Sequence, residues 1–127
     1  MNAPVFVDTS VLIYAIDSAD ARKQNAAFRW RELLWKNRMG RISFQVLQEF
    51  YVNVLRKQPN ARDEARAEVR DLVEWNPIAM DPPIIELAWK LQDRYQFSFW
   101  DGLIVAAAKS AECGYLLTED LQANQDY

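Results

Sequence analysis

Residues 5–17 read VFVDTSVLIYAID, and this stretch decides the class of fold. Its first three residues form an apolar run after Pro4, which predicts a buried strand that stops at Asp8. A helix is expected at once, because Thr9 or Ser10 can cap it and apolar residues recur behind them at helical spacing. A buried strand that passes directly into a helix is the unit from which parallel α/β sheets are built.

Three further short apolar segments predict strands, and amphipathic helices separate them. The predicted strands cover residues 41–43, 77–80 and 115–117. The first of the predicted helices after that of segment 5–17 is capped by Asp20 and ended by Gly40. The next is capped by Ser43, and another covers the charged segment 61–75. The last two follow Asp81-Pro82-Pro83 and begin at Ser98. This alternation requires a short parallel sheet with helices on both faces, so we expect a single three-layer α/β/α domain over residues 1–127.

The composition excludes several classes of protein and of site. Of the 127 residues, 50% are hydrophobic and 26% are charged, as in a globular protein, and no apolar run approaches the length of a membrane span. Cys113 is the only cysteine, so no internal disulfide is possible, and we expect a cytoplasmic protein without membrane contact. The absence of histidine excludes His-based acid–base catalysis and His metal ligands. Three scattered glycines provide no phosphate-binding loop.

The charges are distributed unevenly along the chain, although the net charge is only -3. Residues 22–70 contain twelve Lys and Arg against five Asp and Glu, whereas residues 71–127 contain three against ten. A basic central segment can attract a polyanion, because the local field and not the total charge steers it. Amphipathic helices with solvated basic faces explain the same pattern, and both interpretations stay open.

Carboxylates follow the first and last predicted strands. Asp8 ends the first strand, and the last strand continues through Thr118 into Glu119 and Asp120. Asp101 lies in the first turn of the helix before that last strand, which places it at the same edge of the sheet. Such a cluster repels itself and persists only beside a cation. Mg²⁺ or Mn²⁺ accepts carboxylate and water oxygens and needs neither His nor Cys.

Each of these residues also has a structural interpretation. Asp8 can act as a helix N-cap, and Asp101 fits a capping box that starts at Ser98. The pair Glu119 and Asp120 can form a solvated turn. Taken one at a time, the acidic residues therefore do not establish a site.

Helix periodicity alone predicts that Glu49 is a surface residue, since it lies opposite the apolar stripe of its helix. Cys113 is most simply a small buried apolar residue near a helix end. The tryptophans are expected in the core or at an interface and not as platforms for nucleobases, because no alternation of basic and aromatic residues singles them out. They are Trp30, Trp35, Trp75, Trp89 and Trp100.

Four phrases of the sequence resemble the PIN-domain nucleases, and most closely their bacterial VapC-type toxin branch. They are VFVDTSVLIYAID at 5–17, ISFQVLQEFYVNVLRK at 42–57, SFWDGLIVAAA at 98–108 and LLTEDLQ at 116–122. The resemblance implies that the acidic catalytic and metal-binding positions of the family fall on Asp8, Glu49, Asp101 and Asp120. It also implies that polar neighbours hold these carboxylates or the waters around the metal ion, namely Thr9, Ser10, Thr118 and Glu119.

The resemblance implies an endoribonuclease that depends on Mg²⁺ or Mn²⁺. In such chemistry a metal ion activates water, shields the phosphodiester and stabilises the leaving 3′ oxygen, so histidine is not required. Basic residues of segment 22–70 would position the RNA backbone. The candidates are Arg22, Lys23, Arg29, Arg38, Arg56 and Lys57. The toxin branch further implies a homodimer and a cognate antitoxin that adds a hydrophobic helix and covers the acidic site.

The same resemblance implies one departure from the family. Its members usually continue with another short strand after the segment that matches LLTEDLQ, whereas this sequence stops at Tyr127. We therefore expect the final edge strand of the sheet to be missing or truncated.

Three other functions stay open on the sequence. The chain can be an RNA-processing PIN nuclease without an antitoxin, or an inactive PIN-like interaction module, which the loss of two or more acidic residues would have favoured. Asp8-Thr9-Ser10 also resembles the start of phosphoaspartyl phosphatases, but their pattern requires a second Asp where Ser10 stands.

Overall fold

The computed structural model describes residues 3–119 and 123–124, in which short strands alternate with helices. The strands are β1 (Val5–Val7), β2 (Gly40–Arg41), β3 (Tyr115–Leu117) and β4 (Ala123–Asn124). The helices are α1 (Thr9–Ile16), α2 (Ala21–Asn37), α3 (Phe44–Lys57), α4 (Arg62–Leu72), α5 (Pro82–Tyr95) and α6 (Phe99–Ser110). Two 3-10 turns, η1 (Pro59–Ala61) and η2 (Val73–Trp75), flank α4.

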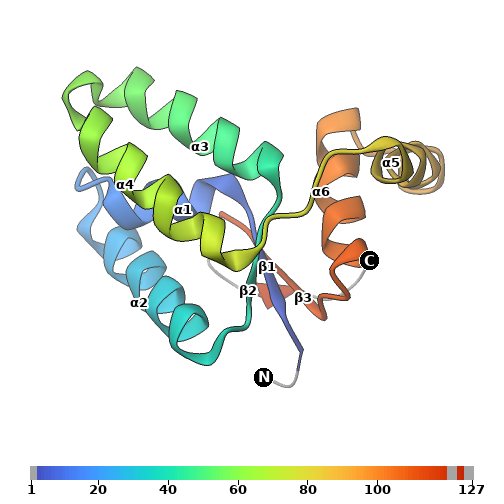
Figure 1. Cartoon of the computed structure of the whole chain (residues 1–127), viewed down its shortest axis with the longest axis horizontal. Helices are drawn as coiled ribbons and strands as arrows, with labels where there is room; N and C mark the ends of the chain where they lie inside the picture. The colour runs from blue at the N-terminus through green and yellow to red at the C-terminus, as the bar shows by residue number, and fades with distance from the viewer. Residues whose placement is uncertain (1–2, 120–122, 125–127) are drawn as a thin grey trace.

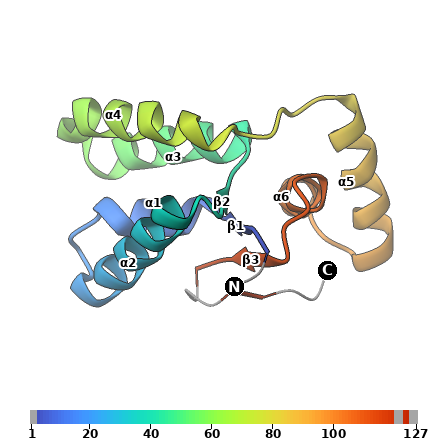
Figure 2. The same cartoon turned by 60° about the horizontal axis from the view of Figure 1, so that its bottom comes forward.

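The strands form one sheet in the order β2-β1-β3-β4. β1 pairs in parallel with both β2 and β3, so that Val5 lies opposite Gly40 on one side and opposite Tyr115 on the other. Helices α1 to α4 lie on one side of the sheet, and α5 and α6 lie on the other (Figures 1 and 2). The three-layer α/β/α fold class expected from the sequence is therefore confirmed.

The core is built around β1. Val5, Phe6 and Val7 are almost completely buried, because helices cover both faces of the strand. On the second face, every residue of α6 between Gly102 and Ala108 is buried, and the absence of a side chain at Gly102 lets α5 approach closely. A side chain at Gly102 would place its Cβ 3.1 Å from the backbone oxygen of Ala88 on α5. The packing of α5 therefore fixes the position of the first turns of α6.

The strand predicted over residues 77–80 is wrong, because only one bridge forms there. Ile78 pairs in parallel with Ser43, as its N–H donates to Ile42 O at 2.9 Å and its O accepts from Phe44 N–H at 3.0 Å. Pro77 has no N–H to extend the ladder in one direction. In the other direction Asp81 caps α5 and its first turn begins with prolines, so the extended segment ends. The edge of the sheet is reduced to this bridge.

The predicted end of the second helix at Gly40 is also wrong. Helix α2 ends at Asn37, and the left-handed turn that closes it falls on Arg38, with φ of 56°. Gly40 belongs to β2, where a Cβ would lie 2.5 Å from the ring of Trp75. A glycine is therefore required at position 40 because the indole ring of Trp75 packs against it, and not because a helix ends there.

A short strand does follow β3. In β4, Asn124 and Ala123 pair antiparallel with Leu116 and Leu117, so the edge strand after the segment LLTEDLQ has two residues. Among the described residues, none of the helices combines the length and the apolar character that crossing a lipid bilayer demands.

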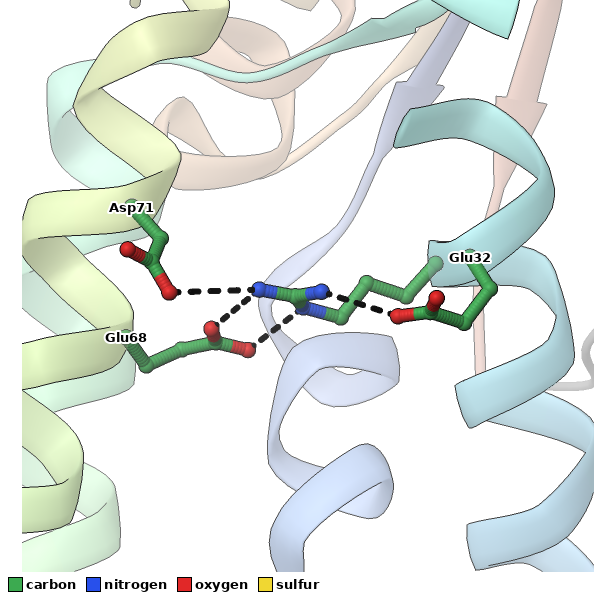
Figure 3. A network of polar contacts seen from close by, with 4 residues as sticks. Glu32, Glu68 and Asp71 are labelled. Carbon is green, nitrogen blue, oxygen red and sulfur yellow. Dashed lines mark hydrogen bonds and ion pairs between the residues drawn. The ribbon is translucent and has the colours of Figure 1, made fainter. Parts of the chain in front are cut away.

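An ion-pair network ties α2 to α4 across α1 (Figure 3). Arg31 on α2 donates from Nε to Glu68 Oε2 at 2.7 Å, and its Nη2 pairs with the other carboxylate oxygen of Glu68. These two side chains are only 14% and 10% exposed, whereas the further partners Glu32 and Asp71 are 55% and 62% exposed. The bidentate pair with Glu68 is thus the contact that is shielded from water.

We expect Glu68→Ala to lower the free energy of unfolding by about 2–4 kcal/mol, because it leaves the Arg31 guanidinium shielded without its main partner. Glu32→Ala removes an exposed partner of the same arginine and should cost less than about 1 kcal/mol. Urea denaturation of both variants measures the difference. Equal losses in the two variants would show that the shielded pair contributes no more than the exposed one.

Candidate active site

Asp8 occupies the first residue after the central strand. Its backbone N–H donates to Leu117 O at 3.0 Å, which fastens it to the end of β3. Its side chain caps α1, since Oδ1 accepts the N–H of Thr9 at 2.7 Å. The capping interpretation of Asp8 is therefore correct, and the same bond orients the carboxylate at the carboxyl edge of the parallel strands, where open α/β sheets place their ligand sites.

Asp101 enters this edge from the opposite layer. Gly114, after α6, donates its N–H to Pro4 O at 2.9 Å, so the end of α6 lies beside the start of β1 and its first turn lies toward the other edge. Half of the predicted capping box forms, since Ser98 Oγ accepts the N–H of Asp101 at 3.1 Å. Within the part of the chain that the structure describes, the exposed Asp101 carboxylate has no hydrogen bond or ion pair. It is thus free to face a ligand.

Glu49 comes from the middle of α3, and the surface position that periodicity predicts for it is wrong. The residue is half-buried, and its Oε1 is buried with no hydrogen-bond partner among the described residues. Gln45, one turn earlier, is buried as well, and its Nε2 donates to Trp100 O at 3.5 Å. A polar stripe of Gln45, Glu49 and Asn53 at intervals of four residues runs along α3, and it was the available sequence signal for this inward face.

The pKa shifts of Asp8 and Glu49 show that these carboxyl groups lie close enough to affect one another. Burial raises the pKa of Asp8 above its ordinary value; the Thr9 hydrogen bond opposes this shift, while Asp101 and Glu119 add to it. Burial also raises the pKa of Glu49; the Gln45 amide acts against this shift, while Asp8 and Asp101 reinforce it. The negative charge of Asp101 therefore affects both of these half-buried carboxyl groups.

The remaining predicted residues lie beside this group or outside the described chain. Thr9 and Ser10 open α1, and their hydroxyl oxygens are buried without a hydrogen-bond partner among the described residues. Thr118 and Glu119 follow β3 directly, the first half-buried and the second exposed. The predicted site residue Asp120 lies outside the described residues.

The donor set fits a hard divalent cation in its chemistry. It consists of carboxylate and hydroxyl oxygens, and the buried Glu49 Oε1 is an acceptor without a donor. In the described residues no Lys or Arg forms an ion pair with Asp8, Glu49 or Asp101. The same part of the chain contains no ready-made group of three acidic or Cys side chains close enough to enclose a metal ion. We call this group of Asp8, Glu49 and Asp101, at the carboxyl ends of the parallel strands, the acidic edge. Within the described residues, none of its carboxylates is paired with a positively charged side chain.

Comparison with known proteins agrees with this architecture. None of the curated proteins compared with the sequence matches it. Among solved structures, the VapC20 toxin of Mycobacterium tuberculosis, described as cleaving the sarcin-ricin loop, superposes with a TM-score of 0.68 at 21% identity. The match covers 90% of this chain and 88% of that one, and at this identity it concerns the fold. The sequence model of the PIN domain matches residues 5–125, nearly the entire length, and the chain therefore belongs to the PIN domain family.

Proposed function

We propose that the protein is an endoribonuclease that depends on Mg²⁺ or Mn²⁺ and acts in the cytoplasm as the toxin of a toxin–antitoxin pair. The observation that carries the proposal is the acidic edge itself, where burial, with a further contribution from Asp101, raises the pKa of both Asp8 and Glu49 and no basic side chain of the described residues forms an ion pair with them. Buried like charges without a counter-ion are unfavourable, and a bound cation removes the conflict. Membership of the PIN family and the RNA-cleaving VapC20 relative support the choice of RNA as substrate.

In this proposal Asp8, Glu49, Asp101 and Asp120 hold the cation. When bound, the cation supplies activation of water and neutralisation of the phosphodiester, both of which hydrolysis requires. Asp8 is oriented for this role by the Thr9 N–H, and Asp101 by the Ser98 cap of α6. Thr9 and Ser10, with Thr118 and Glu119, would orient the carboxylates and the waters of the site.

Glu49 is the best placed of these residues to move a proton. Its Oε1 is buried and has no hydrogen-bond partner in the described chain, so this atom is open to a water of the site. A proton taken from the attacking water can therefore be held at Glu49 Oε1. A pathway through a pair of histidines is excluded because the sequence contains none.

The proposal includes a homodimer and a cognate antitoxin as protein partners. Exposed apolar surface supports the binding of a partner helix from an antitoxin. Phe44 and Val73 are 43% and 47% exposed, and they line a groove of about 390 Å³ between α3 and α4. Arg66 and Arg70 also line this groove. A partner helix that combines apolar and acidic side chains fits these contacts.

We expect the purified protein to cleave a panel of single-stranded and structured RNAs with Mn²⁺ or Mg²⁺ and not with EDTA. Asp8→Asn and Asp101→Asn should each lower the rate about a hundredfold or more, because each removes a charged oxygen from the cation. Gel analysis of cleaved RNA measures the rates. Asp63→Asn, which neutralises an exposed acidic residue in the first turn of α4, is the matched control and should keep the wild-type rate. Metal-independent cleavage, or full activity in both site variants, would contradict the proposal.

We also expect Asp8→Asn to raise the thermal stability of the metal-free protein near neutral pH. The pKa of Asp8 is raised on folding, so the folded state binds its proton more tightly than the unfolded chain, and stability falls as pH rises through that interval. Asn keeps the N-cap but carries no charge, so its advantage should vanish below about pH 3.8, where the carboxyl is protonated in both states. Calorimetry across pH measures this difference.

The same calorimetry also measures how much Mn²⁺ stabilises the wild-type protein and Asp8→Asn. Mn²⁺ at a hundred times its dissociation constant should stabilise the wild-type protein by about 2.7 kcal/mol and the variant by clearly less. A destabilised variant at neutral pH, or equal metal shifts in both proteins, would show that Asp8 serves α1 alone.

A further inference from the structure

A cavity lies at the edge of the sheet opposite to the acidic carboxyl groups. It has a volume of about 580 Å³ and opens where α2, β2, η2 and the end of α6 meet. It is lined by Gly40, which pairs with the first residue of β1, and by Ala111, which caps α6 at its C-terminal end. Asp101 is ten residues earlier on α6, so about 15 Å of helix separates the cavity from the acidic edge.

Two tryptophans form the aromatic wall of this cavity. The ring centroids of Trp35 and Trp75 are 6.0 Å apart, and the ring planes are inclined by 42°. Trp75 is held against the backbone of β2, since only a glycine at position 40 leaves room for its ring. Trp35 is backed by the Arg31 guanidinium at 5.3 Å. Both indoles are half-buried and line open space. The sequence predicted the tryptophans in the core or at an interface and not as platforms for nucleobases, and the position of these two leaves one part of each ring accessible from the cavity.

Two arginines stand beside these rings. Arg41 Nη1 donates to the backbone oxygens of Arg38 and Gly40 at 3.0 and 2.9 Å, which holds its guanidinium and leaves its other N–H groups available. The Arg38 side chain is exposed and has no hydrogen bond or ion pair within the described residues. Glu74 and Asn76 also line the cavity, so two positive charges face one negative charge there.

We propose that this cavity binds one nucleotide of an RNA strand, with the base against an indole ring and a phosphate at the two arginines. Base–aromatic stacking and guanidinium–phosphate pairing are the two contacts that nucleic-acid surfaces combine, and here they occur within one cavity. Its volume lies in the range of small-molecule sites. Glu74 and Asn76 offer an acceptor and an amide to the edge of the base.

The choice of RNA rests on the proposed ribonuclease function. At about 15 Å from the acidic edge, the bound nucleotide is not at the cleaved bond but in a distant part of the same RNA. The cavity therefore selects and orients the substrate without taking part in the chemistry.

Binding is tested without cleavage, in EDTA, with a short fluorescent 2′-O-methyl oligonucleotide followed by anisotropy and by tryptophan quenching. The test variant is Arg38→Gly. Arg38 has φ of 56°, a conformation that favours glycine, so the substitution removes the side chain without disturbing the fold. The matched control is Lys36→Ala, which removes one positive charge from the last turn of α2, two residues before Arg38; Lys36 does not line the cavity.

We expect Arg38→Gly to weaken oligonucleotide binding about tenfold and to reduce the quenching, and Lys36→Ala to change binding less than about twofold. Equal effects of the two substitutions, or an unchanged Kd in Arg38→Gly, would overturn the inference. A mononucleotide that binds as tightly as the oligonucleotide would also overturn it, because the cavity would then take a free nucleotide. If Arg38→Gly weakens binding while the wild-type protein cleaves no RNA, the nuclease proposal fails and this inference stands.

Discussion

The position of β1 between two parallel neighbours is the constraint on which the rest of the structure depends. Val5, Phe6 and Val7 are buried on both faces, and their backbone pairs with β2 on one side and β3 on the other. A strand fixed in this way cannot shift its register without exposing its apolar side chains and breaking both ladders. The position of Asp8, the next residue, is therefore fixed at the carboxyl edge of the sheet.

At the acidic edge, carboxylates that repel one another are held in fixed positions by the packing of the fold. Asp8 is oriented by the N–H of Thr9, and α6 is seated by the close approach of α5 at Gly102. Glu49 comes from the other layer on α3, where its side chain is half-buried. Packing thus holds carboxyl groups together whose charges oppose it, which is the arrangement expected where a protein uses its folding energy to prepare a cation site.

Local chemistry made much of this predictable. The apolar run 5–7, the caps Asp20, Ser43 and Ser98, and the strand 115–117 all depend on residues adjacent in sequence, and all form as expected. The strand at 77–80 is limited to one bridge at Ile78, because Pro77 has no N–H to donate and the chain turns into α5 at the Asp81 cap. Gly40 was misread because its partner, Trp75, is distant in the sequence.

In the candidate site, too, the positions set by local sequence could be predicted and those set by tertiary packing could not. Asp8 and Asp101 follow from strand ends and helix starts, whereas Glu49 depends on how α3 rotates against the other layer, which its apolar stripe alone does not reveal. The resemblance to PIN nucleases supplied that position. The cavity at Trp35 and Trp75 could not be anticipated, since its walls come from elements that meet only in the folded chain.

The central claim is that Asp8, Glu49 and Asp101 form one electrostatically coupled group, and an NMR titration of the side-chain carboxyl carbons tests it most directly. In the metal-free protein we expect the pKa of Asp8 and of Glu49 to lie above their ordinary values of 3.8 and 4.5. Both should decrease in Asp101→Asn, because that substitution removes a negative charge from each. Ordinary pKa values in the wild-type protein, or values that Asp101→Asn leaves unchanged, would contradict the account.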